Sequence, residues 1–255
     1  MTKTADIELA TPEQCLSFGA RVATKVGKMG VPFDVLQSVL NDGNDHPVYA
    51  AIEGALLPKA CEATEYPHVE GVVMDQIIDW RKFYVVRLGF DVDMAGVRIP
   101  ARVKGFDRLI VVPQGISVNQ VYEKGKVCFP SWKWCDDDLE SVMRELERGG
   151  AKETYAIWVR DGREADKDLR KMSAEDIAER KIDTESLLER LLHGFKYWSE
   201  TGKHLDERSY TLCASSRFAD GFVPRVLRSS FGRVCVYWFD VRRADPSLGA
   251  RRAVR

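Results

Sequence analysis

Two stretches decide the fold class of this 255-residue chain: ESLLERLLHGFKYWSE at residues 185–200 and VCVYWF at residues 234–239. The first repeats apolar side chains at steps of three and four, which predicts a helix with one buried face. Asp183 and Thr184 are suited to cap its start, and Gly202 is suited to end it. The second stretch is apolar or aromatic on both faces, which predicts a central β-strand.

Further strand-like runs lie on both sides of these stretches. They are rich in β-branched and aromatic residues and cover residues 82–90, 97–103, 108–112, 155–159, 210–214, 222–227 and 250–254. Pro100 predicts that the second of these runs is an edge strand or contains a bulge. Shorter helices are expected at residues 117–123, 136–148 and 173–180. This order predicts an α+β fold, a mixed and largely antiparallel sheet covered by helices.

The first part of the chain has a different pattern. Residues 13–28, 33–40 and 48–57 show helical spacing, and residues 58–68 form a polar stretch that contains proline. We therefore expect two parts, a helical N-terminal region over residues 1–70 and an α+β domain over residues 71–255.

Composition excludes several classes of protein. The chain is 45% apolar and 30% charged, with a net charge of −1, so no global field attracts nucleic acid or anionic lipid. No apolar leader or membrane-length segment occurs, and the six cysteines are scattered, which predicts a cytoplasmic protein with reduced thiols and no membrane association. No phosphate-binding loop or dinucleotide fingerprint occurs, so we expect no cofactor.

Positive charge is concentrated in the last forty or so residues. Residues 217–255 carry nine arginines and no lysine, against three aspartates, a local charge of +6. Guanidinium groups bind phosphates and stack on bases, and aromatic rings provide stacking platforms. The candidate ligand-binding residues are Arg217, Arg228, Arg242, Arg243, Trp238, Trp132 and Trp134.

Each of these candidates also has a structural interpretation. The arginines could pair with the acid-rich segments at residues 136–147 and 164–179, and Trp132 and Trp134 could fill a gap between sheet and helix. The loops at residues 215–221, 228–232 and 242–248 are the expected contact surface.

Cysteine, histidine and aspartate provide weaker candidates. Cys213 in CASSR could be a nucleophile beside His204 or His193, although buried cysteine is the commoner state and we expect His193 at the polar margin of its helix. Cys128 and Cys135 are spaced too widely for a structural zinc pair. The acidic pairs Asp91/Asp93 and Asp136–Asp138 suit a hard cation but also suit turns and helix caps, so no metal site is predicted.

The segments ESLLERLLHGFKYWSETGKHLD, TLCASSRFADGFVP, VCVYWFDV and ARRAVR carry a resemblance. Residues 155–255 resemble a set of uncharacterised bacterial proteins. They are also similar to the final third of C-type-lectin-like domains of the bacterial, formylglycine-enzyme-related kind, although the Gly-Gly-Ser-Trp signature is missing. The resemblance implies a binding scaffold whose last loops form the contact surface.

These observations support three hypotheses. The first is a non-enzymatic binding or protein-interaction module that recognises a protein or another ligand. The second is a nucleic-acid-associated protein that uses an arginine-rich C-terminal face. The third is a thiol-dependent enzyme that uses Cys213.

Overall fold

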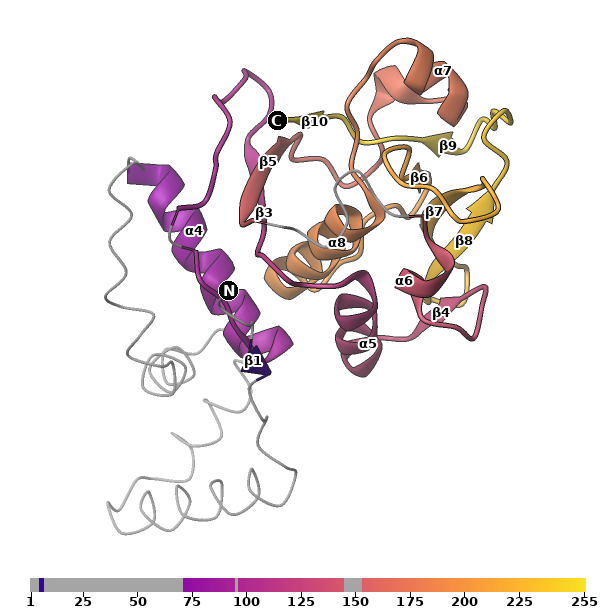
Figure 1. Ribbon diagram of the computed structural model, residues 1–255. Helices are drawn as coiled ribbons and strands as arrows, with labels where there is room; N and C mark the ends of the chain where they lie inside the picture. The colour runs from indigo at the N-terminus through magenta and orange to yellow at the C-terminus, as the bar shows by residue number, and fades with distance from the viewer. Residues whose placement is uncertain (1–4, 7–70, 95, 145–152) are drawn as a thin grey trace, which may run out of the picture.

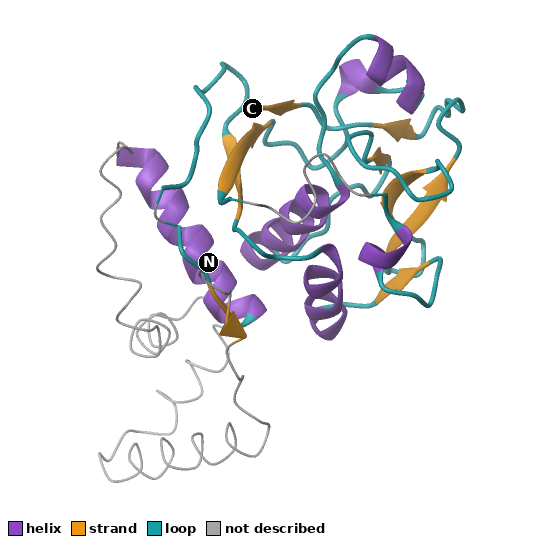
Figure 2. Ribbon diagram, viewed as in Figure 1, coloured by secondary structure: helices purple, strands orange, loops and turns teal. Residues whose placement is uncertain are grey.

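The computed structural model describes residues 5–6, 71–94, 96–144 and 153–255 (Figure 1). The helices expected at residues 13–28, 33–40 and 48–57, and the connector at residues 58–68, lie outside the described residues. The boundary expected near residue 70 therefore stays a prediction. In the described part, helices and strands together form the predicted α+β fold (Figure 2).

Helix α8 (Leu187–Thr201) is the helix predicted from the apolar repeat. Figure 1 shows it between two groups of strands, and it packs against a strand of each. Its cap is Ser186, whose hydroxyl accepts from the backbone N–H of Glu189 while the Glu189 carboxylate accepts from the backbone of Ser186. Thr184, expected as a cap, instead forms a β-bridge with Arg252. Gly202 ends the helix at φ 67°, a left-handed conformation that glycine adopts without strain.

On one side of α8 lies a three-stranded antiparallel sheet. Its spatial order is β10 (Ala253–Val254), β5 (Tyr155–Val159) and β3 (Arg108–Val112). The bounds of β3 and β5 are those predicted from sequence. Helix α4 (Gly71–Phe83) packs on β3, where Trp80 Nε1 donates to the carbonyl of Leu109 at 2.8 Å.

On the other side lies a five-stranded mixed sheet. Its spatial order is β4 (Ser131–Lys133), β8 (Val234–Phe239), β7 (Val223–Arg228), β6 (Tyr210–Leu212) and β9 (Leu248–Gly249). The β4–β8 and β6–β9 pairs are parallel, and the two other pairs are antiparallel. β8 is paired on both sides, as its two apolar faces predict.

The prediction of a strand at residues 82–90 is wrong. α4 continues through Phe83 into a π-helix, η3 (Tyr84–Leu88), and the strand β2 covers Phe90–Asp91 and pairs with β1 (Ala5–Asp6). The side chains of Trp80, Tyr84 and Leu88 are buried at four-residue steps, so packing of a helical face overrides the β-propensity of the run.

Residues 97–103 do not form the predicted strand either. Arg98 makes one parallel bridge to Tyr155, and the carbonyl of Pro100 accepts from the indole Nε1 of Trp158 at 2.9 Å. Proline cannot donate to a sheet, so the segment ends its pairing early.

The helix predicted from residue 136 onward begins later and ends earlier than expected. α6 covers Leu139–Val142, and Met143 turns to an extended conformation and bridges Phe218. The predicted stop at residues 149–150 lies outside the described residues. The described residues also contain the helical elements α5 (Val118–Cys128), η4 (Lys167–Leu169) and α7 (Ala174–Glu179).

Two apolar clusters hold these elements together. The main cluster joins α4, α5, α8 and both larger sheets, and a smaller one lies beneath α7 at the β6–β9 end of the five-stranded sheet. Within the described residues, no helix is both long enough and apolar enough to cross a membrane.

Candidate functional site

Strand β8 presents its aromatic side chains on two opposite faces. The Trp132 ring from β4 lies 4.7 Å from the ring of Tyr237, whereas Trp238 lies 4.8 Å from Phe222. Successive residues of a strand point to opposite faces, so Trp132 and Trp238 occupy different surfaces. The predicted binding residues therefore do not form one site.

The face that carries Tyr237 also carries an arginine surrounded by aromatic rings. Arg225 of β7 is paired in register with Tyr237, and its guanidinium carbon lies 4.7 to 5.6 Å from three ring centroids. These rings belong to Phe239, Tyr237 and Tyr210. Arg243, from the loop after β8, lies over the same Phe239 ring at 5.6 Å.

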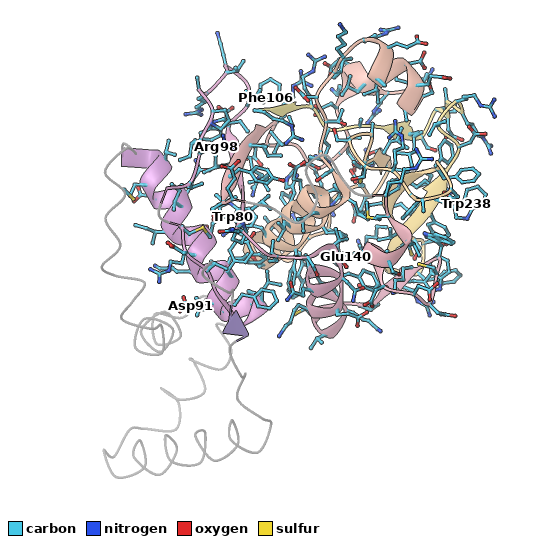
Figure 3. All side chains as sticks on the ribbon, in the orientation of Figure 1. Trp80, Asp91, Arg98, Phe106, Glu140 and Trp238 are labelled. Carbon is cyan, nitrogen blue, oxygen red and sulfur yellow. The ribbon has the colours of Figure 1, made fainter. Side chains whose placement is uncertain are left out.

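We call this surface the arginine–aromatic face. It consists of Trp132, Tyr210, Arg225, Tyr237, Phe239 and Arg243. Trp132 is 39% exposed and Arg243 is exposed, whereas Tyr210, Arg225 and Tyr237 are half-buried. Figure 3 shows the five-stranded sheet at the edge of the molecule, with Trp238 and Arg98 labelled at opposite sides.

Neither arginine of this face forms an ion pair in the described part of the chain, although the carboxylate of Asp245 interacts electrostatically with both. Arg225 makes no ion pair there, and its Nε is buried without a hydrogen bond. Desolvation lowers the pKa of Arg225, and the neighbouring Arg243 lowers it further, while Tyr210, Asp245 and Tyr237 act in the opposite direction. Two guanidinium groups on one ring, in partly apolar surroundings, favour an anion beside them.

The remaining predicted site residues lie elsewhere. Arg228 pairs with Glu207 at 2.9 Å, and Arg242 pairs with Asp240 at 3.6 Å. Arg217 donates to the carbonyls of Ala214 and Ser216. These three guanidinium groups are therefore already occupied.

The two other predicted tryptophans are also placed. Trp134 is partly buried and packs edge-on against Phe218 at 5.4 Å, which agrees with the gap-filling interpretation. Trp238 is 48% exposed on the opposite face from Trp132. Among the described residues of the acid-rich segments, Asp168 pairs with a tail arginine, Arg252, at 3.7 Å.

Sequence reasoning missed Arg225, Tyr210, Tyr237 and Phe239 as site residues. Tyr237 and Phe239 alternate along one strand, and that pattern places them on one face. The position of Arg225 against them depends on the β7–β8 register, which the turn between the strands sets and the apolar pattern leaves open.

Cys213 does not have the surroundings of a nucleophile. Its side chain is fully buried, and desolvation raises its pKa well above the ordinary value for a thiol. Reactive thiolates require a lowered pKa and access to solvent. The geometry therefore does not support the thiol-enzyme hypothesis.

His193 lies in the core, so its expected place at the polar margin of α8 is wrong. Its Nδ1 lies 2.7 Å from Oε1 of Glu185, and both side chains are fully buried. Burial raises the pKa of Glu185 and lowers that of His193, so both tend to their neutral forms.

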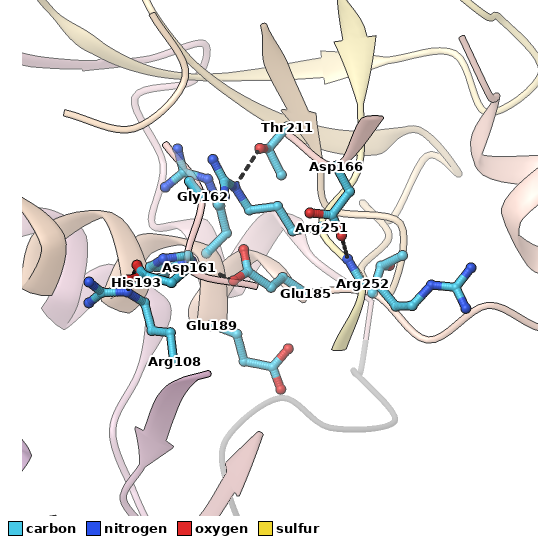
Figure 4. Close-up of polar contacts among 12 residues, drawn as sticks. Arg108, Asp161, Gly162, Asp166, Glu185, Glu189, His193, Thr211, Arg251 and Arg252 are labelled. Carbon is cyan, nitrogen blue, oxygen red and sulfur yellow. Dashed lines mark hydrogen bonds and ion pairs between the residues drawn. The ribbon is translucent and has the colours of Figure 1, made fainter. Parts of the chain in front are cut away.

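A network of buried ions lies next to this pair. Asp206 accepts from Arg190 at 2.6 Å and from Arg251 at 2.7 Å. Figure 4 shows Arg251 beside Thr211, which accepts from its Nε at 3.2 Å, and Asp166 at the backbone N–H of Arg252. The network joins α8 to the chain near β10. Its ions are paired with each other and shielded from solvent, so we assign it to stability.

A polar cavity of about 160 Å³ opens between α4, β3 and α8. Arg108 pairs there with Asp161 and Glu200, both at 2.8 Å, and Lys196 pairs with Asp79 and Glu200. Each of these cations already has two carboxylates, whereas Arg225 and Arg243 form no ion pair within the described residues.

Within the described residues, no three histidine, cysteine, aspartate or glutamate side chains gather as a metal site would need. Comparison with protein-family models, curated proteins and solved structures found no match. The resemblance of residues 155–255 to C-type-lectin-like domains therefore stays a prediction.

Proposed function

We propose that this protein is a non-enzymatic binding protein that takes up an anionic ligand on its arginine–aromatic face. One observation carries the proposal. The guanidinium of Arg225 lies among three aromatic rings without forming an ion pair in the described residues, and Arg243 shares one of those rings.

The unfavourable electrostatics of this arrangement support the presence of a bound ligand in the functional state. Two cations over the same ring repel each other, and a half-buried guanidinium without a hydrogen bond at Nε loses part of its solvation. A bound anion would offset both effects, because hydrogen bonds to ionised acceptors are the strong ones. The loop at residues 242–248, expected as a contact segment, contributes Arg243 to this face.

The proposal is tested with inorganic polyphosphate, which offers negative charge without any other group. We expect calorimetric titration at low salt to detect binding, and the double variant Arg225→Gln, Arg243→Gln to weaken it at least tenfold. The matched control is Arg98→Gln, Arg102→Gln, which also removes two positive charges. These arginines have side chains 70% and 50% exposed and pair with Glu153 and Asp107, away from this face.

Thermal unfolding of each variant separates loss of binding from loss of structure. If both double variants weaken polyphosphate binding equally, net charge alone explains the loss, and the arginine–aromatic face is rejected as the binding site. Absence of polyphosphate binding to the folded wild-type protein would reject the proposed function.

A further inference from the structure

We infer that the ligand of the arginine–aromatic face is single-stranded nucleic acid. This inference rests on the proposed function and specifies the chemistry of the ligand. An anion alone requires cations, whereas this face combines its cations with the exposed ring of Trp132 and the half-buried ring of Tyr237.

The exposed ring surface suits a planar partner. Trp132 is 39% exposed, and its ring is tilted 42° against that of Tyr237, so one tryptophan face is not covered by Tyr237. Aromatic side chains and guanidinium planes are the groups on which unstacked bases lie in proteins that bind single strands. Phosphates would then meet Arg225 and Arg243.

The dimensions of the face indicate a ligand longer than one nucleotide. Apart from Arg243, its residues come from β4, β8, β7 and β6, which are four neighbouring strands of one sheet. At a strand spacing of about 4.8 Å, these strands span roughly 14 Å. Trp132 lies on β4 at the edge of the sheet and Arg225 lies on β7, so a base on the Trp132 ring and a phosphate at Arg225 would occupy different positions along this span.

Two competing ligands are less well matched to these residues. Bases in a duplex are stacked and paired, so their faces cannot reach the rings on a flat sheet. An acidic peptide would pair with Arg225 and Arg243 but would leave Trp132 without a planar partner. Single-stranded nucleic acid uses both kinds of group.

The test compares four probes. Labelled fifteen-nucleotide oligo-dT and oligo-U are titrated by fluorescence anisotropy at 50 mM salt. Unlabelled polyphosphate and polyglutamate then compete with them for the protein. We expect an oligonucleotide to bind more tightly than polyphosphate of equal charge. Trp132→Ala should weaken oligonucleotide binding about tenfold and leave polyphosphate binding unchanged.

Trp238→Ala is the matched control, because it removes a tryptophan that is 48% exposed on the opposite face of the same sheet. It should leave binding unchanged. The double variant Arg225→Gln, Arg243→Gln should also reduce the slope of log K against log salt by about 0.7 for each arginine removed.

The outcomes separate the two proposals. If polyphosphate binds as tightly as oligonucleotides, or if Trp132→Ala changes nothing, the inference of nucleic acid is rejected and the anion site stands. Stronger competition by polyglutamate would assign the face to an acidic protein and would also reject the inference. If no probe binds the folded protein, both proposals fall.

Discussion

Arg251 donates from Nη2 to Oδ1 of Asp206 at 2.7 Å, although 2% or less of either side chain is exposed. The same guanidinium donates to the carbonyls of Gly162 and Arg163, both at 2.7 Å. An arginine that the tail composition assigned to a charged surface is therefore a core residue, and its partners come from two separate parts of the chain, residues 162–163 and Asp206.

Replacing Arg251 with Met should reduce the free energy of unfolding by about 3–5 kcal/mol, because it removes one of the two arginines paired with the buried Asp206 and leaves two carbonyls without this donor. Urea unfolding monitored by circular dichroism measures the change. Arg242→Met is the control. Arg242 is 74% exposed and pairs on the surface with Asp240, so its replacement should change stability by no more than about 0.5 kcal/mol. Equal effects of the two substitutions would contradict the buried network.

Gly249→Ala should destabilise the protein by about 1–3 kcal/mol. A methyl group at Gly249 would lie 2.8 Å from Cβ of Ala165, which is closer than two carbon atoms approach without displacement of the chain. Gly162→Ala is the matched control, because its new methyl group would lie at an ordinary 3.7 Å from its nearest neighbour, the carbonyl oxygen of Glu164. Melting temperatures of both variants test the difference, and an unchanged Gly249→Ala variant would show that β9 does not pack as described.

His204 should make stability depend on pH. Burial lowers its pKa to about 4, and the ring packs edge-on against Phe129 and stacks beside Trp198. The unfolded chain binds a proton at His204 below about pH 6.5, while the folded chain stays neutral there until about pH 4. Its contribution is therefore complete above pH 6.5 and is lost as the pH falls toward 4.

His204→Phe keeps the ring contacts and removes the proton site. Over this pH range, the free energy of unfolding of the variant should fall less steeply than that of the wild-type protein, by up to about 1.4 kcal/mol per pH unit. Urea unfolding at pH 7, 6 and 5 gives both slopes. Parallel curves would mean that His204 titrates alike in the folded and unfolded chains.

Cysteine labelling should follow burial. Cys128 is exposed, whereas Cys213 is fully buried with a raised pKa. N-ethylmaleimide at pH 8 should modify Cys128 in the native protein and reach Cys213 after unfolding in urea. Peptide mass spectrometry locates the adducts. Rapid native labelling of Cys213 would restore the thiol-enzyme hypothesis.

Sequence patterns predicted the elements whose burial follows a simple period. The four-residue apolar steps of α8 and the uniformly apolar runs of β3 and β5 are set by local spacing, and these elements form near the expected bounds. Residues 82–90 were misassigned because Tyr84 and Leu88 suit both a strand and a buried helical face, and contact with β3 selects the helix.

The site depended on information that local patterns do not contain. Arg225, Arg243 and Arg251 belong to the same arginine-rich segment, yet one lies among rings, one is exposed and one is buried with Asp206. Long-range pairing and register decide between these states. Trp132 and Tyr237 are a hundred residues apart, and the parallel β4–β8 pairing brings them together.

The split of the tail between two sheets has a consequence for cooperativity. β9 completes the five-stranded sheet and β10 belongs to the three-stranded sheet, with residues 250–252 between them. Loss of either strand would displace residues 250–252, which link the two sheets, and would move Arg251 away from its buried partners. Both sheets should therefore open as one unit, and amide hydrogen exchange at the centres of β5 and β7 should proceed with the same opening free energy.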